Sequence, residues 1–414
     1  MLNKLPTGWQ QCCFEDLLDY EQPTKYIVKN TNYEDKGVAV LTAGKSFILG
    51  YTKETTGIFY GDKEPVIIFD DFTTSSKLVK FPFKVKSSAM KILHAKDNIN
   101  VDFIYYLMQT ISYRNETHKR YWISEYAKQK LNLPPLDEQG RIVEKIEELF
   151  SDIDNGIKDL KTAQARIKQY RQSVLKSAFE GKLYKTSEWK EVKLEDVCQI
   201  NPKTEIKDMK DDDIVSFLPM TSVKAECNYY AEENVLYSKV KKGYTKFKNG
   251  DVLFAKITPC MENGKVCIVD NLIQGIGFGS TEFHILRCLN NIISKYVYYF
   301  VIQQCFRKKA KKNMAGAVGQ QRVPADFMKN FDIPLPTLTE QQQIVAEIEK
   351  RFAAADEIEK AVNDSLLQAE KLKQSILKQA FAGKLVPQNS NDEPAAVLLE
   401  RIKAAKENST KGKK

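Results

Sequence analysis

Several short motifs bring together residues that could bind a nucleotide, and each lacks a part that such binding needs. Gly44-Lys45-Ser46 ends like a phosphate-binding loop, but the first glycine of that loop would have to be residue 39, which is Ala39. In GIGFGS, Ser280 stands where a dinucleotide fingerprint needs spacing to a third glycine. The sequence therefore gives no support for nucleotide hydrolysis, and we interpret GIGFGS as a turn with close backbone packing.

Residues that could act as general bases or metal ligands are scattered. His94, His118 and His284 are too few and too far apart in the sequence for a metal cluster or a catalytic triad. Asp70-Asp71 could belong to a metal-dependent nuclease, but adjacent side chains of a strand point to opposite faces. The string LPPL at residues 133–136 is similar to the Pro-Pro loop of amino-methyltransferases, yet leucine replaces its Asn or Asp, which favours a helix entry. We expect no catalytic residue and no metal site in this chain.

Basic side chains interleaved with hydroxyl and amide side chains recur in two parts of the sequence. Lys and Arg neutralise phosphates, while Arg, Asn, Gln, Ser and Thr can pair with base edges in the major groove. The candidate DNA-contact residues are Thr74, Ser75, Ser76, Lys77, Lys119, Arg120, Lys241, Lys242, Lys256, Lys265, Arg307, Lys308, Lys311, Gln320, Gln321 and Arg322. The alternative for each of them is a solvated surface position.

The composition is that of a water-soluble protein, with 43% hydrophobic and 28% charged residues and a net charge of +9. Lys and Arg exceed Asp and Glu by 18 to 15 in residues 1–136 and by 23 to 18 in residues 184–337. No apolar run is long enough for a membrane span, and Met1 to Pro6 lacks the apolar core of a signal peptide. The eight cysteines contain no CxxC pair, so we expect reduced cysteines in a cytoplasmic protein.

An internal repeat governs the organisation of the chain. Residues 138–183 match residues 340–385 without a gap, and 18 of the 46 positions are identical. The segments before them repeat more faintly, since Trp9 and Trp189 each precede a Glu-Asp pair at the same distance. The order is therefore variable domain, helix, variable domain, helix.

Each copy of the stronger repeat is predicted to be one long helix. Prolines precede each copy, and Gly181 or Gly383 follows its last periodic residue. Apolar residues recur every 3.5 positions on average, as in a coiled-coil seam. This seam is formed by Ile146, Leu149, Ile153, Ile157, Leu160, Ile167 and Val174 in the first copy and by Ile348, Phe352, Ala355, Ile358, Val362, Leu366, Ala369, Leu372 and Ile376 in the second. We expect the two helices to pair antiparallel as a rigid bar; separate packing on neighbouring domains, or homodimerisation, is the alternative.

The segments between the helices combine strand and helix patterns. Strands are predicted at Ser46–Tyr51, Val66–Phe69, Leu78–Val85, Val215–Leu218, Asp251–Ile257, Val266–Val269 and Glu282–Leu286, and helices at Val101–Ser112 and Ser294–Lys312. Residues 87–106 align without a gap with residues 280–299. The predicted fold class is α+β, with two similar mixed α/β domains separated by two long antiparallel coiled-coil helices in a pseudo-two-fold internal repeat.

Several strings together resemble the specificity subunit of type I restriction-modification systems. GDVLFAKITPCMENGKVCIV (250–269), GFGSTEFHILR (277–287) and IIFDDFTTSSKLVKFPFKVKSSAMKIL (67–93) resemble its target-recognition domains. IPLPTLTEQQQIV (333–345) and LKQAFAGKLVPQ (377–388) resemble its helical spacer, of which LPPLDEQGRIV is a shorter variant. The resemblance covers almost the whole chain.

This resemblance gives the domain division and the role that we expect. It implies target-recognition domains at 1–136 and 184–337, spacer helices at 137–183 and 338–386, and a tail at 387–414. The tail contains a helix-like segment, Glu393 to Lys406, which we expect to dock near the N-terminal domain. The resemblance further implies that each domain reads one half of a bipartite asymmetric site in double-stranded DNA while the helices set the spacing between the halves.

The resemblance also implies partners that carry the reactions. Two methyltransferase subunits would dock on the helices and methylate adenine, and restriction and translocase subunits would join them. S-adenosylmethionine, ATP and Mg would then be held by those partners, and this chain would have no cofactor and no catalytic activity of its own.

Other classes of protein remain as alternatives to this reading. The first is an adaptor that holds protein partners on the coiled coil and never touches DNA. The second is a self-sufficient methyltransferase, which would need a methyl-donor site that we do not find in the sequence. RNA recognition is a further alternative, but no aromatic RNA-binding motif is present.

Overall fold

The computed structural model describes residues 5–42, 46–111, 120–206, 208–317 and 319–411. The chain divides into two compact units, one formed by Met1–Leu160 with Asp364–Lys414 (unit 1) and the other by Lys161–Asn363 (unit 2). Within the described part of the chain, every helix is too short or too polar to cross a membrane.

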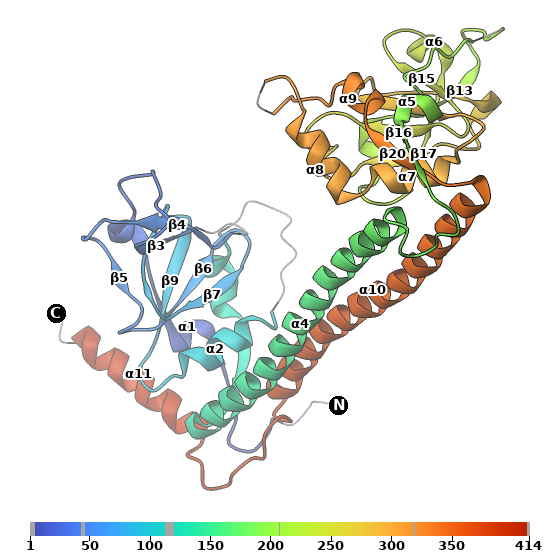
Figure 1. Ribbon diagram of the computed structural model, residues 1–414. Coiled ribbons are helices and arrows are strands. Elements are labelled where there is room, and N and C mark those ends of the chain that lie inside the picture. The colour runs from blue at the N-terminus through green and yellow to red at the C-terminus, as the bar shows by residue number, and fades with distance from the viewer. Residues whose placement is uncertain (1–4, 43–45, 112–119, 207, 318, 412–414) are drawn as a thin grey trace. The chain divides into compact units, whose positions relative to one another are not determined.

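Two four-stranded sheets lie face to face in the described residues of unit 1 (Figure 1). Their strand orders are β2-β9-β6-β7, which is antiparallel, and β4-β3-β8-β5, in which β3 and β8 are parallel. The strands are β2 (Leu18–Glu21), β3 (Val38–Leu41), β4 (Ile48–Thr52), β5 (Phe59–Tyr60), β6 (Val66–Asp70), β7 (Ser76–Val79), β8 (Pro82–Val85) and β9 (Met90–Ala95). Along β6, Val66 and Ile68 face the core between the sheets, while Ile67 and Phe69 face a helical layer. Both faces of β6 are therefore buried.

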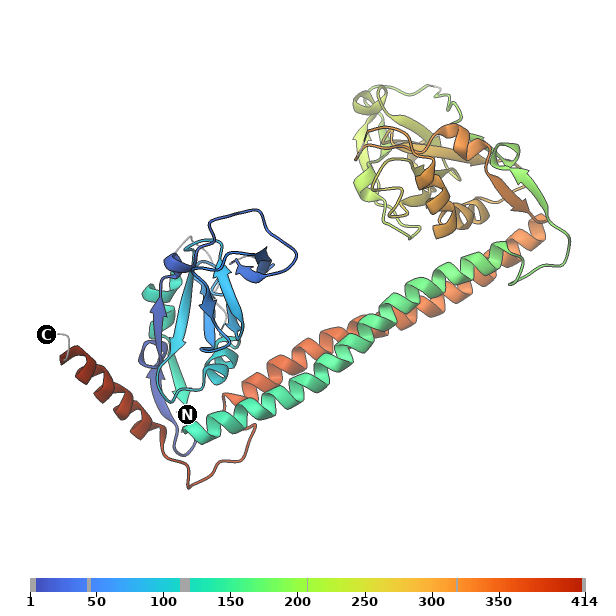
Figure 2. The same cartoon turned by 60° about the vertical axis from the view of Figure 1, so that its left-hand side comes forward.

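Helices cover the other face of the β2-β9-β6-β7 sheet in unit 1. Phe103 of α2 (Val101–Met108), Trp122 of α3 (Tyr121–Ser124) and Leu398 of α11 (Ala395–Lys411) belong to one core. In both views α11 lies beside the N-terminal domain, where it contacts α1 (Phe14–Leu17) (Figures 1 and 2). The N–H of Ala395 donates to the carbonyl of Gly8 at 2.9 Å. Helix α11 therefore lies within the tail and packs on the N-terminal domain.

Unit 2 repeats the same topology strand for strand. Its sheets have the orders β12-β19-β16-β17 and β14-β13-β18-β15, and β13 and β18 are the parallel pair. The strands are β12 (Cys198–Ile200), β13 (Ile214–Leu218), β14 (Glu233–Leu236), β15 (Thr245–Lys248), β16 (Val252–Ala255), β17 (Val266–Ile268), β18 (Ile276–Gly279) and β19 (Phe283–Cys288). The helices are α5 (Leu194–Val197), α6 (Tyr237–Val240), α7 (Ser294–Val301), α8 (Gln304–Lys312) and α9 (Ala325–Lys329). The predicted internal repeat is therefore a repeat of structure.

Two predicted elements are divided in the structure. The predicted strand Leu78–Val85 is β7 and β8, which belong to different sheets, because Pro82 has no N–H for a continuous ladder and restricts the residue before it. The predicted helix Ser294–Lys312 is α7 and α8. It breaks at Gln303, whose backbone is extended and whose buried side chain donates to the carbonyl of Phe300 at 3.1 Å.

The long helices α4 (Leu136–Phe179) and α10 (Leu338–Ala380) end in the same way. Gly181 and Gly383 adopt positive φ angles of 71° and 68°, and the residue after each glycine donates its N–H back to the last helical turn. This is the geometry that a glycine stop provides, since a residue with a Cβ is strained there.

Within each unit, a segment of α4 lies antiparallel to a segment of α10 (Figure 2). In unit 1, Lys373 Nζ lies 2.5 Å from Asp154 Oδ1. In unit 2, Gln164 Nε2 donates to Asn363 Oδ1 at 2.6 Å, and Arg171 Nη2 lies 2.5 Å from Asp356 Oδ1. In an antiparallel pair, one residue number rises as the other falls, so a fixed register gives a constant sum. The sum is 527 in all three pairs, and the same register therefore holds within each unit.

The seam between these helices differs from the predicted one at two positions. Ile358 and Leu372 are 56% and 51% exposed, so they lie outside the seam. Their neighbours Glu359 and Lys373 are less exposed, at 33% and 18%, and pair with Arg171 and Asp154 of the other helix. Polar pairs in a helix seam are known to fix register, and here they replaced apolar residues that periodicity alone favours.

Each domain is joined to its following helix by a tryptophan and a glutamate. The indole Nε1 of Trp9 donates to Glu138 at 3.0 Å in unit 1, and that of Trp189 donates to Glu340 at 3.4 Å in unit 2. A two-strand ribbon completes each joint, β1 (Gln10–Cys13) with β10 (Lys130–Leu133) and β11 (Lys190–Lys193) with β20 (Asp332–Leu335). The joint sets how each domain sits on its own helix.

Candidate nucleic-acid interface

The β6–β7 turn of unit 1 presents part of the predicted basic cluster. Asp70 organises it, because its carboxylate accepts from the N–H of Phe72 at 2.9 Å and from Thr73 Oγ1 at 2.5 Å. The turn reverses through a positive φ at Thr74 and exposes Ser75 and Lys77 to solvent. Ser76 differs from its neighbours, since it is 6% exposed and its hydroxyl accepts from Gln109 at 2.8 Å. We therefore leave Ser76 out of the proposed contact set.

Asp71 fixes the segment that follows α2. Its carboxylate accepts from the N–H of Trp122 at 2.9 Å, and its carbonyl accepts from the N–H of Tyr121 at 2.9 Å. The buried ammonium of Lys91 lies 3.6 Å from the same carboxylate. The Asp70-Asp71 pair therefore shapes two loops, as opposite-facing side chains allow, and Arg120 lies exposed at the end of the second. The predicted contact Lys119, together with Gly44, Lys45 and His118, lies outside the described residues.

In unit 2 the matching segments carry more basic side chains. Lys242 is exposed, and Lys241 lies 2.7 Å from Asp211. Lys265 donates to the carbonyl of Met220 at 2.8 Å, which holds the end of the β16–β17 loop. Burial lowers the pKa of Lys256, which lies beside Arg322 and Glu282.

Arg322 is held by a carboxylate that the sequence had not suggested. Its Nε and Nη2 donate to the two oxygens of Glu282 at 2.8 and 2.7 Å, and Nη1 donates to the carbonyl of Gln320 at 3.0 Å. The carbonyl of Gln321 accepts from Thr258 at 3.0 Å, which ties this loop to the β16–β17 loop. Hydrogen bonds from Arg322 lower the pKa of Glu282. In the ungapped alignment Glu282 stands opposite Ala89, and this difference was the only signal for it in the sequence.

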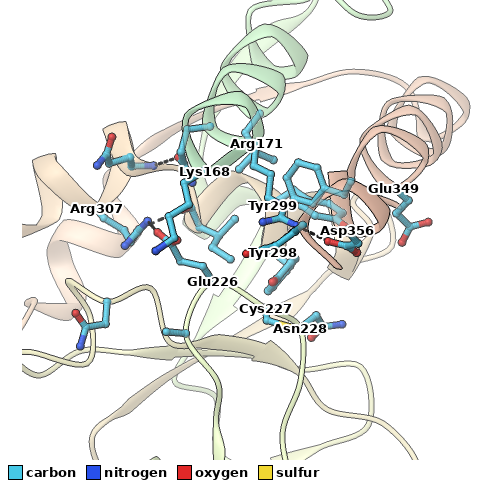
Figure 3. A pocket seen from close by; sticks show the side chains of 18 of the residues that line it. Lys168, Arg171, Glu226, Cys227, Asn228, Tyr298, Tyr299, Arg307, Glu349 and Asp356 are labelled. Carbon is cyan, nitrogen blue, oxygen red and sulfur yellow. Dashed lines mark hydrogen bonds and ion pairs between the residues drawn. The ribbon is translucent and has the colours of Figure 1, made fainter. Parts of the chain in front are cut away.

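The basic residues of α8 differ in burial, because two lysines are exposed and the neighbouring arginine is buried. Lys308 and Lys311 are exposed, and Lys311 Nζ lies 2.5 Å from Glu262. Arg307 is 6% exposed; it donates to the carbonyls of Ile302 and Glu262 and pairs with Glu226 (Figure 3). Its guanidinium is committed to the interior, so the structure does not support the predicted DNA contact at Arg307.

Replacing Arg307 with methionine is expected to lower the free energy of unfolding of unit 2 by about 2–3 kcal/mol, because two buried carbonyls lose a charged donor. Urea denaturation would measure this loss. The matched control is Lys308→Met, which removes the same charge from an exposed neighbour and should change stability by less than about 0.5 kcal/mol. Equal stabilities of the two variants would contradict the interior role of Arg307.

His284 is a structural residue in the core of unit 2. Its Nε2 lies 2.8 Å from the carbonyl of Val323, and its Nδ1 lies 3.0 Å from the amide nitrogen of Asn201. Burial lowers the pKa of His284, so the imidazole is neutral and its Nε2–H donates to Val323. Among the described residues, no group of three or more His, Cys, Asp and Glu side chains is placed to bind a metal.

The lowered pKa of His284 predicts that the stability of unit 2 depends on pH. As the pH falls below about 6.5, the unfolded chain binds a proton more readily than the folded chain, so unit 2 should lose stability. The matching residue of unit 1 is Lys91, so unit 1 has no histidine at this position. Hydrogen exchange at pH 7 and pH 5.5 should show β19 less protected at the lower pH, and His284→Gln should remove the difference. An equal loss of protection in His284→Gln would overturn the assignment.

The glycines of GIGFGS allow close packing, as predicted. A Cβ on Gly277 would lie 2.3 Å from the ring of Phe247, and one on Gly279 would lie 2.5 Å from the carbonyl of Leu218. No space is left at this strand for a dinucleotide.

A cavity of about 860 Å³ in unit 2 lies between α4, α7, α10 and two loops (Figure 3). Tyr298 and Tyr299 line it together with charged side chains that pair with one another, such as Arg171 with Asp356 and Arg307 with Glu226. Arg171 and Arg307 of the lining are therefore already paired with carboxylates.

The geometry defines a protein of two repeated sheet domains, each with an exposed arginine, Arg120 or Arg322, on a loop whose end packs against a central strand. A family model described as the type I restriction modification DNA specificity domain matches residues 6–162 and again residues 186–368. The chain belongs to this family, and the two matches correspond to the two copies of the fold.

Named relatives agree with this assignment. The chain is 32% identical to the EcoR124I/EcoR124II specificity subunit of Escherichia coli over 370 residues, which cover 81% of this chain and 84% of that subunit. It is 35% identical to the EcoAI specificity subunit of Escherichia coli over 257 residues, which cover 52% of this chain. The matched regions span less than half the length of the EcoAI and EcoEI subunits, 43% and 48%.

Solved structures share the fold. A chain from a type I R-M system, studied for complex assembly and conformational transition, aligns with a TM-score of 0.68 at 18% identity, covering 92% of this chain and 99% of that one. The HsdS subunit from Thermoanaerobacter tengcongensis aligns with a TM-score of 0.50 over the same shares at 18% identity. The predicted fold class, two sheet-containing domains with two long helices, is confirmed.

Proposed function

We propose that this chain is the DNA-reading subunit of a type I restriction-modification complex. Each domain reads one half of a bipartite asymmetric site in double-stranded DNA, and the paired helices set the spacing between the halves. Family membership supports the role, and the observation that carries it is that equivalent loops of both domains end in an exposed arginine, Arg120 and Arg322. Backbone contacts by lysines position each domain, and side chains at base edges provide the specificity.

The reactions belong to partner subunits in this proposal, and the chain itself is not an enzyme. Two methyltransferase subunits dock on the helices and methylate adenine, and restriction subunits join them in the cytoplasm. Exposed apolar side chains on α10 support docking there, since Ile358, Leu367 and Leu372 are each more than half exposed. S-adenosylmethionine, ATP and Mg are then bound by the partners.

An exchange of one domain tests this function. In a complex assembled with its methyltransferase subunits, replacing residues 1–136 by another domain of the same family should change only one half of the methylated site. Mapping of methylated adenines by long-read sequencing would show it. A change in both halves rejects modular reading, and the absence of salt-dependent duplex binding by the unmodified complex favours a protein adaptor instead.

A deletion that keeps the helix register tests the spacing role. In the register that Asp154 and Lys373 set within unit 1, residues 153–159 of α4 lie opposite residues 368–374 of α10, and removing both blocks removes one matched heptad. The helix pair shortens by about 10 Å. At about 3.4 Å per base pair, the central spacing of the methylated site should fall by about three base pairs. Deleting either block alone serves as the control, because it breaks the register and should abolish methylation.

A further inference from the structure

Arg120 and Arg322 occupy the same position in the two domains. The residue after each arginine donates its N–H to the first residue beyond a central strand, Tyr121 to Asp71 beyond β6 and Val323 to Lys256 beyond β16, both at 2.9 Å. Both arginines are exposed. The chain therefore places a guanidinium at the same edge of both sheets, although the loops before them share no recognisable sequence.

Buried groups beneath the two arginines hold these positions fixed. Lys91 of β9 lies opposite Phe69 of β6, and His284 of β19 lies opposite Phe254 of β16. Because these strand pairs are equivalent, Lys91 and His284 also occupy corresponding positions. Lys91 anchors the loop end through Asp71 at 3.6 Å, and His284 anchors it through the carbonyl of Val323 at 2.8 Å. The contact is an ion pair in unit 1 and a hydrogen bond in unit 2. In both domains a buried side chain therefore holds the backbone next to the arginine.

The arginines differ in what faces them. Arg322 makes a bidentate pair with Glu282, whereas the residue that corresponds to Glu282 in unit 1 is Ala89, which has no carboxylate. The side chain of Arg322 is 44% exposed and that of Glu282 is 24% exposed, so the pair lies at the surface. The two nitrogens that Glu282 occupies form the fork that would also bind the two acceptors of a guanine edge.

We propose that Arg120 and Arg322 are the corresponding base-reading residues of the two domains, and that Glu282 competes with DNA for Arg322. This inference rests on the proposed DNA-reading function. A single phosphate oxygen near Glu282 meets a like charge, but a guanine edge offers O6 and N7 as two neutral acceptors and can replace both carboxylate bonds. Glu282 therefore weakens binding of Arg322 to groups other than a guanine edge and increases the discrimination between bases in one half-site. Arg120 reads its half-site without such a competitor at position 89.

Substitution of each arginine tests the correspondence. In the complex with its methyltransferase subunits, Arg322→Ala should reduce binding to a duplex carrying the mapped site by about 5- to 150-fold and relax one base position in one half-site. Arg120→Ala should relax one position in the other half-site. The matched control is Arg401→Ala on α11, which also removes an exposed arginine paired with a single glutamate, Glu393, and should leave the methylated site unchanged.

Removal of the competitor tests the role of Glu282. Glu282→Gln should raise affinity for a scrambled duplex of the same length by about two- to five-fold, the amount expected when one exposed ion pair is lost. Affinity for the mapped site should change less, so discrimination falls. Glu393→Gln frees Arg401 in the same way and changes the net charge equally, so it should alter neither affinity.

Three outcomes separate this inference from the proposed function. If the unmodified complex binds and methylates a defined site while both arginine variants recognise that same site, the inference is overturned and the function stands. If Glu282→Gln leaves discrimination intact while Arg322→Ala relaxes it, the competitor role is overturned. If the unmodified complex shows no preference among duplexes, the proposed function itself fails.

Discussion

Replacing Glu340 with alanine is expected to lower the free energy of unfolding of unit 2 by about 2–3 kcal/mol, because several part-buried donors lose one charged acceptor. Its carboxylate accepts from the backbone and hydroxyl of Thr186 and from the backbone and hydroxyl of Ser187, at 2.7 to 3.1 Å. It also completes a capping box with Thr337 at the start of α10. Hydrogen bonds from Ser187 and Thr186 lower the pKa of Glu340 well below its usual range.

The matched control is the corresponding residue of unit 1. Glu138 is equally buried and binds Trp9, but its second oxygen has no hydrogen-bond partner among the described residues. Burial raises the pKa of Glu138, against the hydrogen bond from Trp9. Removing this carboxylate also removes a poorly compensated buried charge, so Glu138→Ala should cost only about 1 kcal/mol.

Native-state hydrogen exchange would separate the two variants. Glu340→Ala should reduce the protection of β11 and β20, while Glu138→Ala should leave β1 and β10 close to their original protection. The sign of the pH effect gives a second check. A lowered carboxyl pKa means that the contribution of Glu340 is present above about pH 4.5 and is lost as the pH falls through its folded-state pKa. Equal losses in the two variants would show that the extra donors around Glu340 contribute nothing.

The difference between these two joints shows where sequence patterns succeed and where they fail. Glu138 and Glu340 are corresponding positions of the repeat, and both bind the tryptophan of their joint. Yet Pro135 occupies the position of Thr337, so a cap that depends on one hydroxyl exists in only one copy. A sequence alignment shows which residues correspond. It does not show their hydrogen-bond partners, because a hydrogen bond depends on individual atoms, such as the hydroxyl of Thr337.

The packing of α4 against α10 was also predicted only in part. Periodicity predicted two long helices with an apolar seam, and the helices are present. The exposed positions of Ile358 and Leu372 could not be predicted, because the choice between an apolar residue and its charged neighbour depends on the opposite helix. Glu359 and Lys373 enter the seam only because Arg171 and Asp154 face them.

The candidate interface followed from the sequence in outline but not in detail. Interleaved basic and hydroxyl residues indicated loops on which Ser75, Lys77 and Arg120 are exposed. Arg307 could not be told from Lys308 by composition, because only the fold shows which of two adjacent side chains points into the core. Their adjacency on a helix made it certain that they could not both face the same way.

Leu398→Ala is the second substitution with a large expected effect. Leu398 is 2% exposed and belongs to the core that contains Trp9, Phe103 and Ile142, so its truncation should lower the free energy of unfolding of unit 1 by about 2–5 kcal/mol. Helix α11 is also held by Ala395 and Leu399 in the same core, by the Ala395 bond to Gly8 and by Arg141, whose Nη2 lies 2.5 Å from Asp392. Truncation of Leu398 should therefore loosen α11 before the sheets unfold.

The neighbouring Val397 supplies the control, because it lies on the same helix and is 40% exposed. Val397→Ala should change stability by less than about 0.5 kcal/mol, since little buried surface is lost. Hydrogen exchange should show that Leu398→Ala loses protection in α11 and β1 while β16 and β19 of unit 2 keep theirs. If α11 exchanges equally fast in the unmodified chain and in both variants, it is not part of the unit 1 core. If unit 2 loses protection as well, the two units do not unfold as separate cores, and the stability changes assigned to Glu340 and Leu398 must then be measured as changes of the whole chain.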